Sequence, residues 1–488
     1  MSESVKWNST LSFLLAMIGS AVGLGNIWRY PYIAYTNGGG AFLIPYIISI
    51  ILMGIPLLFI EYGAGFKFKA GITKVFRTIN KKYEYLAWYI QLVPFFIMTY
   101  YSCIVAWDLL YIPASITKSW GPNPDNFFTN VILNNIDGFA GLTNISLYVL
   151  IALICIWVIA WCISHKNIND GLAKANKILI PLLFVIMIFI VFYALSLPGA
   201  MIGVSQFITP DWISITNLDI WLAAFGQIFF SLNLGLTIVL AYASYLPDDV
   251  DIPRSALRVA VANCGFEVFT AFGVFGILGY MSSTSGIALN ELVTQGTGLA
   301  FVAFPQVFNT MGIMGNVIGF LFFLCILFAG ITSTTSLIEP VTLSLTNKFG
   351  SDRGHVVKLV CLSGCAVSLL YCTSCGSTII GLFDGFLSQF GLLLNGLLEI
   401  IIIGWIYGVD NLLDDLNRNA TILRLGIEWK FMIKYLIPAI LVVLWISGMK
   451  DLVTSCDAFA LTIQSILIAA LIILPAILTK MPAKVDDY

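Results

Sequence analysis

Residues 16–31 read AMIGSAVGLGNIWRYP and lie inside an apolar segment that is long enough to cross a bilayer. The middle of this segment is unsuited to a simple transmembrane helix, because Gly23 and Gly25 free the backbone and Asn26 and Arg29 are polar. Backbone that leaves the helix at membrane depth must be buried in protein or line a wet cavity. One interpretation is a glycine-kinked span with Arg29 snorkelling to the interface. The other is a discontinuous helix whose freed carbonyls and amides bind an ion and a solute.

The composition indicates an integral membrane protein. Of the 488 residues, 59% are hydrophobic and 10% are charged, whereas a soluble domain carries about 25% charged residues. The apolar runs have the length of helices and not of barrel strands, so the expected fold class is an all-α polytopic membrane protein with twelve transmembrane helices. The spans are expected at residues 11–36, 41–66, 87–115, 146–164, 175–197, 219–245, 256–281, 315–346, 356–373, 377–407, 431–448 and 459–479. The expected partner is the lipid bilayer, and the net charge of -2 gives no reason to expect nucleic acid.

The distribution of basic residues predicts the orientation of the chain. If the N-terminus lies in the cytoplasm, every Lys and Arg except Lys118, Lys450 and Arg29 falls in a cytoplasmic loop or tail. Such an excess of positive charge on one side is typical of cytoplasmic loops. We therefore expect a multi-pass protein of the plasma (cytoplasmic) membrane with both termini in the cytoplasm.

The sixth span repeats the interruption of the first. Residues 227–235 read QIFFSLNLG and place polar residues and a glycine in mid-membrane. Interrupted helices at matching positions in two halves are the best sequence pointer to a transporter's midplane site. We expect a 5+5 inverted repeat with helices 1 and 6 unwound. Residues 1–200 would form the first repeat, 201–410 the second, and 411–488 spans 11 and 12 with the tail.

Residues 19–31, GSAVGLGNIWRYP, resemble the first helix of the neurotransmitter:sodium symporter family, and the likeness continues through residues 37–42, NGGGAF, and Pro45-Tyr46. The branch with this pattern comprises bacterial and archaeal amino-acid transporters. The resemblance implies a sodium-coupled amino-acid symporter that works by alternating access, without an organic cofactor and without enzymatic activity. An amino-acid sensor or a channel on the same fold is the alternative, and a membrane enzyme is a remote one. The oligomeric state is left open.

Hydroxyl groups in the eighth span are candidate sodium ligands. Sodium prefers hard oxygen ligands, and the run Thr332–Ser336 supplies hydroxyls, although such groups usually bond back to the preceding helical turn. The resemblance implies two sodium sites. The first would take oxygens from Ala21, Asn26, Ser231 and Asn263, together with the substrate carboxylate. The second would take the carbonyls of Gly19, Val22 and Ala329 and the hydroxyls of Thr332 and Ser333.

The resemblance also implies a substrate site between the interrupted helices. Tyr101 would meet the substrate carboxylate with the helix-end amides at Gly23 and Gly25, although ordinary core packing is the alternative for this tyrosine. The substrate amine would meet the carbonyls of Ala21, Phe230 and Ser231. The side-chain cavity would be bounded by Ser20, Ile97, Phe230, Asn233, Leu236, Ser333 and Leu337. Because most of these walls are apolar and no aspartate replaces the carboxylate of the substrate, a neutral, hydrophobic amino acid is favoured, with a small polar one second.

Three charged residues inside spans need partners, because an unpaired charge at membrane depth is costly. Arg29 and Asp384 are expected to form the outer gate, or alternatively a purely structural pair. Glu267 stands where chloride-dependent members of the family have a small hydroxyl residue, with Tyr46, Gln227 and Ser231 around it. The carboxylate would replace chloride, so chloride is not expected to be required. The alternative for Glu267 is a protonated, hydrogen-bonded carboxyl group.

The inner gate departs from the family pattern. Ser4 and Asn347 occupy the two positions at which the family has its arginine and aspartate. Lys6 and Glu339 are the expected substitutes.

Cysteine and histidine give no sign of other metal or redox chemistry. The ten cysteines are scattered, mostly in apolar segments. Cys372 and Cys375 have redox spacing without the supporting strand pattern, so whether they are paired is left open. His165 and His355 fall in predicted loops, which argues against a histidine-rich metal site.

Overall fold

The computed structural model describes residues 6–293, 296–453, 457–485 and 488. Within these residues the chain is helical, with no strand and two isolated bridges, Gly39–Pro210 and Ile145–Thr373. Ten described helices are long and apolar enough to cross a membrane. They are Gly40–Phe68, Lys81–Thr117, Leu147–Ser164, Asn169–Ser196, Ile252–Ser285, Gly312–Phe349, Arg353–Cys372, Gly376–Gly408, Ile427–Met449 and Ala458–Lys480.

Several of these spans are built from consecutive α-helices joined by short 3₁₀ or π-helical segments, such as η10 (Leu387–Leu392). The helices of the first half are α1 (Thr10–Ala21), α2 (Leu24–Thr36), α3 (Leu43–Ser49), α4 (Ile55–Phe68), α5 (Ile72–Ile79), α6 (Glu84–Thr117), α7 (Pro124–Asn126), α8 (Leu147–Ser164), α9 (Lys174–Ser196), α10 (Ala200–Ile208), α11 (Leu218–Ser231) and α12 (Ile238–Ser244). Those of the second half are α13 (Ile252–Ser285), α14 (Leu289–Leu292), α15 (Phe304–Thr310), α16 (Gly312–Phe349), α17 (Arg353–Ser368), α18 (Gly376–Phe386), α19 (Leu393–Glu399), α20 (Asp410–Asn417), α21 (Ile427–Phe431), α22 (Ile437–Val453) and α23 (Ala458–Lys480).

The first span is broken where its glycines predict a break. Helices α1 and α2 are bent by 54° and are separated by Val22 and Gly23. Gly23 is the N-cap of α2 in an extended conformation, and its amide donates to Asn26 Oδ1 at 2.8 Å. Asn26, whose polar side chain is unsuited to lipid, therefore accepts a hydrogen bond from a backbone amide that the break exposes.

The sixth span is broken as well. Six residues separate α11 from α12, and Asn233, Gly235 and Thr237 among them have φ angles of 57°, 72° and 59°. This left-handed conformation is ordinary for glycine and unfavourable by roughly 1 kcal/mol for other residues. Neither half is long enough to cross a membrane alone. The described helices thus give ten spans, or eleven with the bent first pair, and twelve stays a prediction that treats α11 and α12 as one span.

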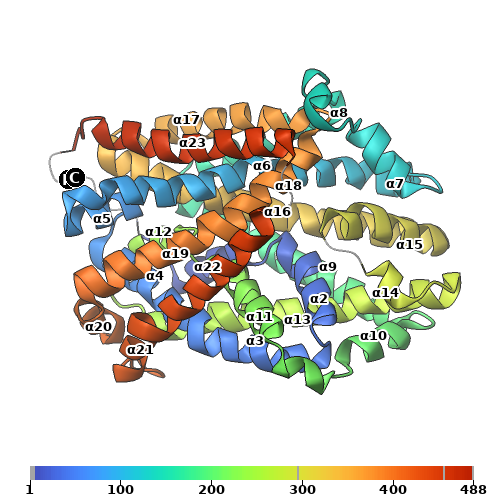
Figure 1. Cartoon of the computed structure of the whole chain (residues 1–488), viewed down its shortest axis with the longest axis horizontal. Coiled ribbons are helices and arrows are strands. Elements are labelled where there is room, and N and C mark those ends of the chain that lie inside the picture. Colours follow the sequence, from blue (N-terminus) through green and yellow to red (C-terminus); the bar gives the residue numbers. More distant parts are fainter. Residues whose placement is uncertain (1–5, 294–295, 454–456, 486–487) are drawn as a thin grey trace.

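Close helix contacts hold the broken halves in place. Helices α17 and α23 both pack on the long helix α6 (Figure 1). Helix α12 lies against α4, where a methyl group added at Gly65 would be 2.1 Å from the Leu240 carbonyl oxygen. Helix α16 lies against α6, where a methyl added at Gly330 would be 2.6 Å from Val105 Cγ2. Only glycine permits either approach.

The connecting helices gather at the two ends of the bundle. Helices α5, α20 and α21 lie at one end, and α7, α10, α14 and α15 lie at the other (Figure 1). The loops with the most lysine and arginine belong to the first of these ends. We expect this lysine-rich end to be cytoplasmic.

Candidate functional site

The two broken helices meet at one backbone carbonyl. Asn233, in the break of the sixth span, donates from Nδ2 to the Ser20 carbonyl in the last turn of α1 at 2.7 Å. Ser333 Oγ of α16 lies 3.5 Å from the same carbonyl. All three residues are buried. Predicted residues from three separate spans thus surround one point, and the amide nitrogen of Asn233 is already used there.

A hydroxyl group without a partner faces the start of α2. Tyr101 Oη is buried and has no hydrogen-bond partner among the described residues. A methyl group added at Gly23 would lie 3.4 Å from this oxygen and 3.3 Å from Ser333 Oγ. The first amides of a helix, here those of Leu24 and Gly25, have no acceptor within the helix and carry partial positive charge. A hydroxyl donor beside such amides suits a carboxylate.

The predicted apolar walls are buried or partly buried. Ile97 is 9% exposed, Leu236 is 8% exposed and Leu337 is 4% exposed. Phe230 is covered by Arg29, whose guanidinium carbon lies 4.0 Å from the centre of the ring. This contact places a cation on the aromatic face and gives the arginine a favourable neighbour within the protein.

Three of the residues predicted for the first sodium site form one hydrogen-bonded chain. Asn26 Nδ2 of α2 donates to Asn263 Oδ1 of α13 at 2.8 Å. Asn263 Nδ2 in turn donates to Ser231 Oγ at the end of α11. Ala21 ends α1 directly before the break. The fold therefore brings oxygen-bearing side chains from three helices, α2, α11 and α13, to one place.

The hydroxyl run of α16 divides into two kinds of side chain. Thr332 Oγ1 donates to the carbonyls of Phe328 and Ala329, both at 3.0 Å, and residues 334–336 likewise bond to the preceding turn. Two serines of this run also reach other helices: Ser333 Oγ lies 3.5 Å from the Ser20 carbonyl of α1, and Ser336 Oγ accepts from the Tyr242 hydroxyl of α12 at 2.8 Å. A hydroxyl that donates to its own helix still presents oxygen lone pairs. Back-bonding therefore leaves Thr332 able to coordinate a cation.

Gly19 and Val22 belong to the last turn of α1 and its end. Val22 closes α1 by donating to the Ile18 carbonyl at 2.7 Å. A methyl group at Gly19 would lie 2.2 Å from Asn176 Oδ1 of α9. This oxygen is buried and has no hydrogen-bond partner in the described part of the chain. Sequence reasoning missed Asn176, although an asparagine inside a span is the signal that would have found it.

Glu267 is surrounded by donors. The Tyr46 hydroxyl donates to Oε2, Gln227 Nε2 donates to Oε1 at 2.9 Å, and Asn26 Nδ2 donates to Oε1 at 3.2 Å. The residue is 0% exposed. The structure therefore brings Tyr46 and Gln227 to Glu267 as expected, and it adds Asn26, which connects the carboxyl group to the predicted sodium ligands.

The structure does not show a direct ion pair between Arg29 and Asp384. No acidic oxygen of the described residues lies within 4.0 Å of the Arg29 guanidinium nitrogens. Asp384 instead accepts hydrogen bonds from the Tyr100 hydroxyl at 2.6 Å and from Ser388 at 3.1 Å. A contact between the two charges, direct or through water, stays a prediction.

At the lysine-rich end, Glu339 is paired differently from the expectation. Its oxygens accept from Arg353 at 2.8 and 2.6 Å, and Oε1 also accepts from the Tyr245 hydroxyl at 2.7 Å. The guanidinium fork matches a carboxylate better than an ammonium group does. Lys6 pairs with Asp248 at 3.1 Å, so its expected pairing with Glu339 is wrong. The hydrogen bond from Lys6 lowers the pKa of the Asp248 carboxyl below its ordinary value.

The remaining inner-gate positions have other contacts. Asn347 Oδ1 accepts from the Gly71 amide at 2.8 Å, and Ser4 lies outside the described residues. Trp7 closes this region, because its indole donates to the Tyr242 carbonyl at 2.9 Å and its amide donates to the Tyr245 carbonyl at 3.0 Å.

The cysteines of the described chain are free thiols, including the buried Cys372 and Cys375. No group of three or more His, Cys, Asp or Glu residues that could hold a metal occurs within residues 6–293, 296–453 and 457–485. The oxygens described above are therefore the candidate cation ligands.

Comparison with known proteins identifies the family. A sequence profile described as the sodium:neurotransmitter symporter family matches residues 4–133 and 122–481. An uncharacterized sodium-dependent transporter of Methanocaldococcus jannaschii is 39% identical over 453 residues, which cover 93% of this chain and 92% of that protein. The sodium- and chloride-dependent creatine transporter 1 of Bos taurus is 28% identical over 457 residues, with coverages of 84% and 71%. The sodium-dependent serotonin transporter of Drosophila melanogaster is 28% identical over 480 residues, with coverages of 90% and 75%. This chain belongs to the sodium:neurotransmitter symporter family and is a sodium-dependent membrane transporter, not an enzyme.

Proposed function

We propose that this transporter carries a neutral, preferentially hydrophobic amino acid into the cell together with sodium, by alternating access across the plasma membrane. Both termini would be cytoplasmic, and residues 1–200 and 201–410 would form the inverted repeats, followed by 411–488. The observation that carries the proposal is the Tyr101 hydroxyl, which is buried without a hydrogen-bond partner among the described residues. It faces the start of α2, where the helix is broken.

The substrate carboxylate is the natural partner for this hydroxyl. An unpaired buried hydroxyl is unfavourable, and a carboxylate that accepts from it and from the first amides of α2 would satisfy all of these donors. The α-amine would then meet the carbonyls of Ala21, Phe230 and Ser231. These carbonyls lie at the ends of α1 and α11, where a helix runs out of intrahelical donors. The Phe230 carbonyl already accepts from the Asn233 amide at 3.1 Å and would offer the amine its second lone pair.

Two sodium ions are proposed as co-substrates, at the ligand sets that the family resemblance implies. The chain of Asn26, Asn263 and Ser231 supports the first site, since three oxygen-bearing side chains from separate helices meet there. The proximity of Ser333 to the Ser20 carbonyl supports the second, because it joins α16 to α1. A tenfold sodium gradient supplies about 1.4 kcal/mol and a charge crossing 100 mV about 2.3 kcal/mol. Two ions would thus drive roughly 7 kcal/mol of accumulation.

The substrate side chain is proposed to be uncharged. Ile97, Leu236 and Leu337 offer no partner for a charge, and a charged side chain would lose its hydration there. Asn233 is less available to a polar substrate than its sequence position suggests, because its Nδ2 donates to the Ser20 carbonyl. This favours aliphatic and aromatic amino acids over small polar ones.

Chloride is proposed to be unnecessary. Three donors already converge on the Glu267 carboxyl group, which supplies a negative charge in its ionised form. The bovine creatine transporter is named as sodium- and chloride-dependent, so the two proteins are expected to differ in this property.

Uptake into liposomes tests the proposal. The purified protein is reconstituted with a sodium gradient and assayed with labelled leucine, methionine, tyrosine, alanine, glutamate and lysine, with potassium replacing sodium as the control. We expect concentrative, sodium-dependent uptake of the neutral amino acids, with little competition by serotonin, which has no carboxylate. Tyr101→Phe should weaken substrate binding about 10–100-fold, since it removes a hydrogen bond to a charged group. Tyr193→Phe, at a partly buried tyrosine of α9, serves as the matched control.

The outcome separates the candidate functions. Binding without concentrative uptake would indicate a sensor, and flux without sodium coupling would indicate a channel. Preferred uptake of glutamate or lysine would mean that the pocket assignment is wrong.

A further inference from the structure

A cleft whose lining contains no residue of the broken helices lies between three other spans. It has a volume of about 320 Å³ and is formed by α6, the span Gly376–Gly408 and α23. Tyr85 of α6, Phe390 of the middle span and Ile472 of α23 are among the residues on its three walls. All of its lining residues are aliphatic or aromatic. Such a cleft excludes a charged ligand and accepts a hydrocarbon chain.

Specific contacts fix the positions of the helices that form the walls of this cleft. The Tyr85 hydroxyl donates to the Ile472 carbonyl at 3.2 Å, which joins α6 to α23. Phe386 and Phe390 stack with their ring centres 5.1 Å apart, and Phe390 packs on Trp445 of α22 at 5.2 Å. Trp445 Nε1 also donates to the Phe390 carbonyl at 3.2 Å. The cleft is therefore preformed and needs no rearrangement to accept a ligand.

One polar group inside the cleft is unsatisfied. Tyr89 lines the cleft, and its hydroxyl oxygen is buried without a hydrogen-bond partner among the described residues. A hydroxyl at membrane depth cannot hydrogen-bond to water. Leaving it unpaired is therefore unfavourable in free energy unless another molecule supplies an acceptor. An ester or ether oxygen near the top of a lipid chain is such an acceptor.

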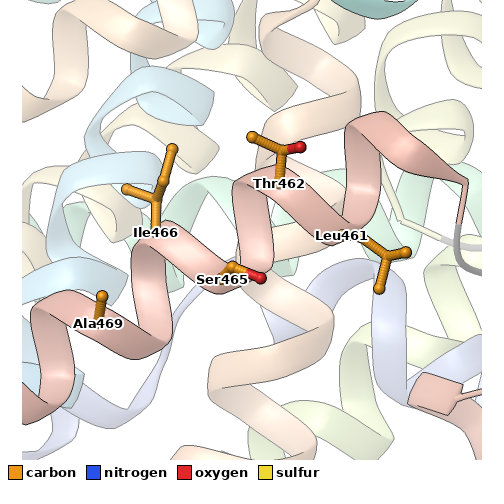
Figure 2. A pocket seen from close by; sticks show the side chains of 5 residues that line it. All are labelled: Leu461, Thr462, Ser465, Ile466 and Ala469. Atoms are coloured by element: carbon orange, nitrogen blue, oxygen red, sulfur yellow. The ribbon is translucent and has the colours of Figure 1, made fainter.

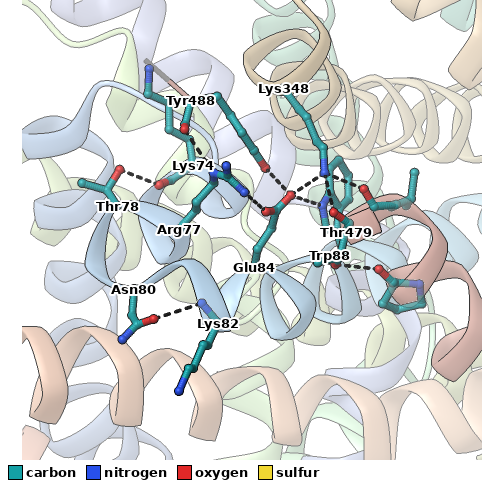
Figure 3. Close-up of polar contacts among 12 residues, drawn as sticks. Lys74, Arg77, Thr78, Asn80, Lys82, Glu84, Trp88, Lys348, Thr479 and Tyr488 are labelled. Atoms are coloured by element: carbon teal, nitrogen blue, oxygen red, sulfur yellow. Dashed lines mark hydrogen bonds and ion pairs between the residues drawn. The ribbon is translucent and has the colours of Figure 1, made fainter. Parts of the chain in front are cut away.

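The end of this cleft nearest Tyr85 is strongly basic. Lys81 and Lys82 precede Tyr85 by one helical turn, and Lys480 ends α23. Among the described residues these three exposed lysines have no ion-pair partner. Figure 3 shows Lys82 pointing away from the buried cluster around Glu84. The lysines are thus available to an anion.

The two helix ends that carry these lysines are held together. Lys348 donates to Glu84 Oε1 at 2.5 Å and to the Thr479 carbonyl at 3.2 Å (Figure 3). Glu84 is the first residue of α6 and Thr479 is the residue before Lys480. The basic side chains just before α6 and at the end of α23 therefore share one end of the cleft.

We propose that this cleft binds an anionic membrane lipid, with one hydrocarbon chain in the cleft and its phosphate headgroup at Lys81, Lys82 and Lys480. The dimensions suit this ligand, because α23 rises about 18 Å between Ile468, on the cleft wall, and Lys480. The apolar lining selects the chain, and the lysines select the charge of the headgroup.

The bound lipid would brace a helix that carries a gating residue. Phe386 lines the cleft two residues after Asp384 on α18. A chain in the cleft would therefore favour the position of α18 in which Phe386 lines the cleft. Lipid binding itself does not depend on the proposed substrate or ion sites.

Native mass spectrometry of the purified full chain tests the proposal. The protein is equilibrated with equal amounts of phosphatidylglycerol and phosphatidylcholine, and the lipid retained on it is measured. We expect the wild type to retain phosphatidylglycerol preferentially. The double variant Lys81→Gln/Lys82→Gln should lower this preference about 25-fold, at about fivefold for each lysine. Leu394→Trp and Ile472→Trp should each displace the chain, and Ile472 is 55% exposed, so its variant leaves the core untouched.

Matched controls separate this site from general lipid contact. Lys174→Gln/Lys177→Gln removes two exposed lysines at the start of α9. Ile466→Trp fills a different hollow, of about 420 Å³, whose lining side chains all come from α23 (Figure 2). Both controls should retain lipid as the wild type does.

Three results would overturn the proposal. The first is equal retention of the two lipids by the wild type. The second is unchanged retention by both tryptophan variants of the cleft, and the third is an equal loss in the control lysine pair.

Discussion

Tyr245→Phe isolates one contact that closes the lysine-rich end of the protein. The substitution removes the hydroxyl that donates to Glu339 at 2.7 Å and leaves the pair between Glu339 and Arg353 in place. Tyr245 follows α12 and Glu339 belongs to α16, so this bond exists only while the two helices lie together. Opening of the protein at this end must break it.

The size of the effect follows from the chemistry of the bond. A hydrogen bond to a charged group contributes about 1.5–3 kcal/mol. Glu339 is 1% exposed, so water does not replace the lost donor while this end is closed. The ratio of the open to the closed form should therefore rise roughly 10–150-fold. An open form populated at about 1% would reach about 10–60%.

Hydrogen–deuterium exchange measures this shift in the open-to-closed ratio without a covalently attached probe. The Trp7 amide donates to the Tyr245 carbonyl at 3.0 Å, so its protection reports closure directly. We expect exchange in the peptides containing Trp7 and α12 to accelerate at least tenfold in Tyr245→Phe. Ser244→Ala is the matched control, because Ser244 donates to the Ala241 carbonyl of its own helix at 2.6 Å. Unchanged exchange in Tyr245→Phe, or equal acceleration in Ser244→Ala, would refute the reasoning.

Three further predictions concern other parts of the molecule. Asp384→Asn should reduce transport more than substrate binding, because the contact with Arg29 is proposed to stabilise the occluded state; a fully active variant would count against the gate. Glu267→Ser should make uptake depend on chloride, measured by replacing chloride with gluconate, and an unchanged response in a folded, active variant would make the carboxyl group structural. Gly65→Ala should lower the thermal unfolding temperature in detergent by an amount equivalent to about 3 kcal/mol, because its methyl group would lie 2.1 Å from a backbone oxygen. Gly265→Ala, with no atom within 4 Å, should have no such effect.

The sequence allowed the broken helices to be predicted because polar residues and glycines inside an apolar span are incompatible with an unbroken helix that faces lipid. That the Glu267 carboxyl group needs donors was predictable for a similar reason, whereas the choice of Tyr46 and Gln227 as those donors came from the family resemblance. The pairing of Glu339 with Arg353 was not predictable. Nothing in the sequence distinguishes Arg353 from the other arginines of the lysine-rich end, and the pair depends on how the loop before α17 folds. Asn176 was predictable as well, because an asparagine inside an apolar span needs a polar partner. The number of crossings is ambiguous because α11 and α12 are each too short to qualify alone.

The position of Asn26 has a consequence for how such proteins can diverge. Its amide oxygen accepts from Gly23, and its amide nitrogen donates to both Asn263 and Glu267. An aspartate at this position could not donate, and an aliphatic residue could neither donate nor accept. Few substitutions of Asn26 would therefore keep these hydrogen bonds. If Glu267 were exchanged for a small hydroxyl residue, the Asn26 amide would lose one acceptor and become available to a bound anion. A lineage that acquires or loses its anion requirement would therefore change the hydrogen bonding of the same asparagine that is proposed to serve the cation site, and the two ion preferences should be inherited together.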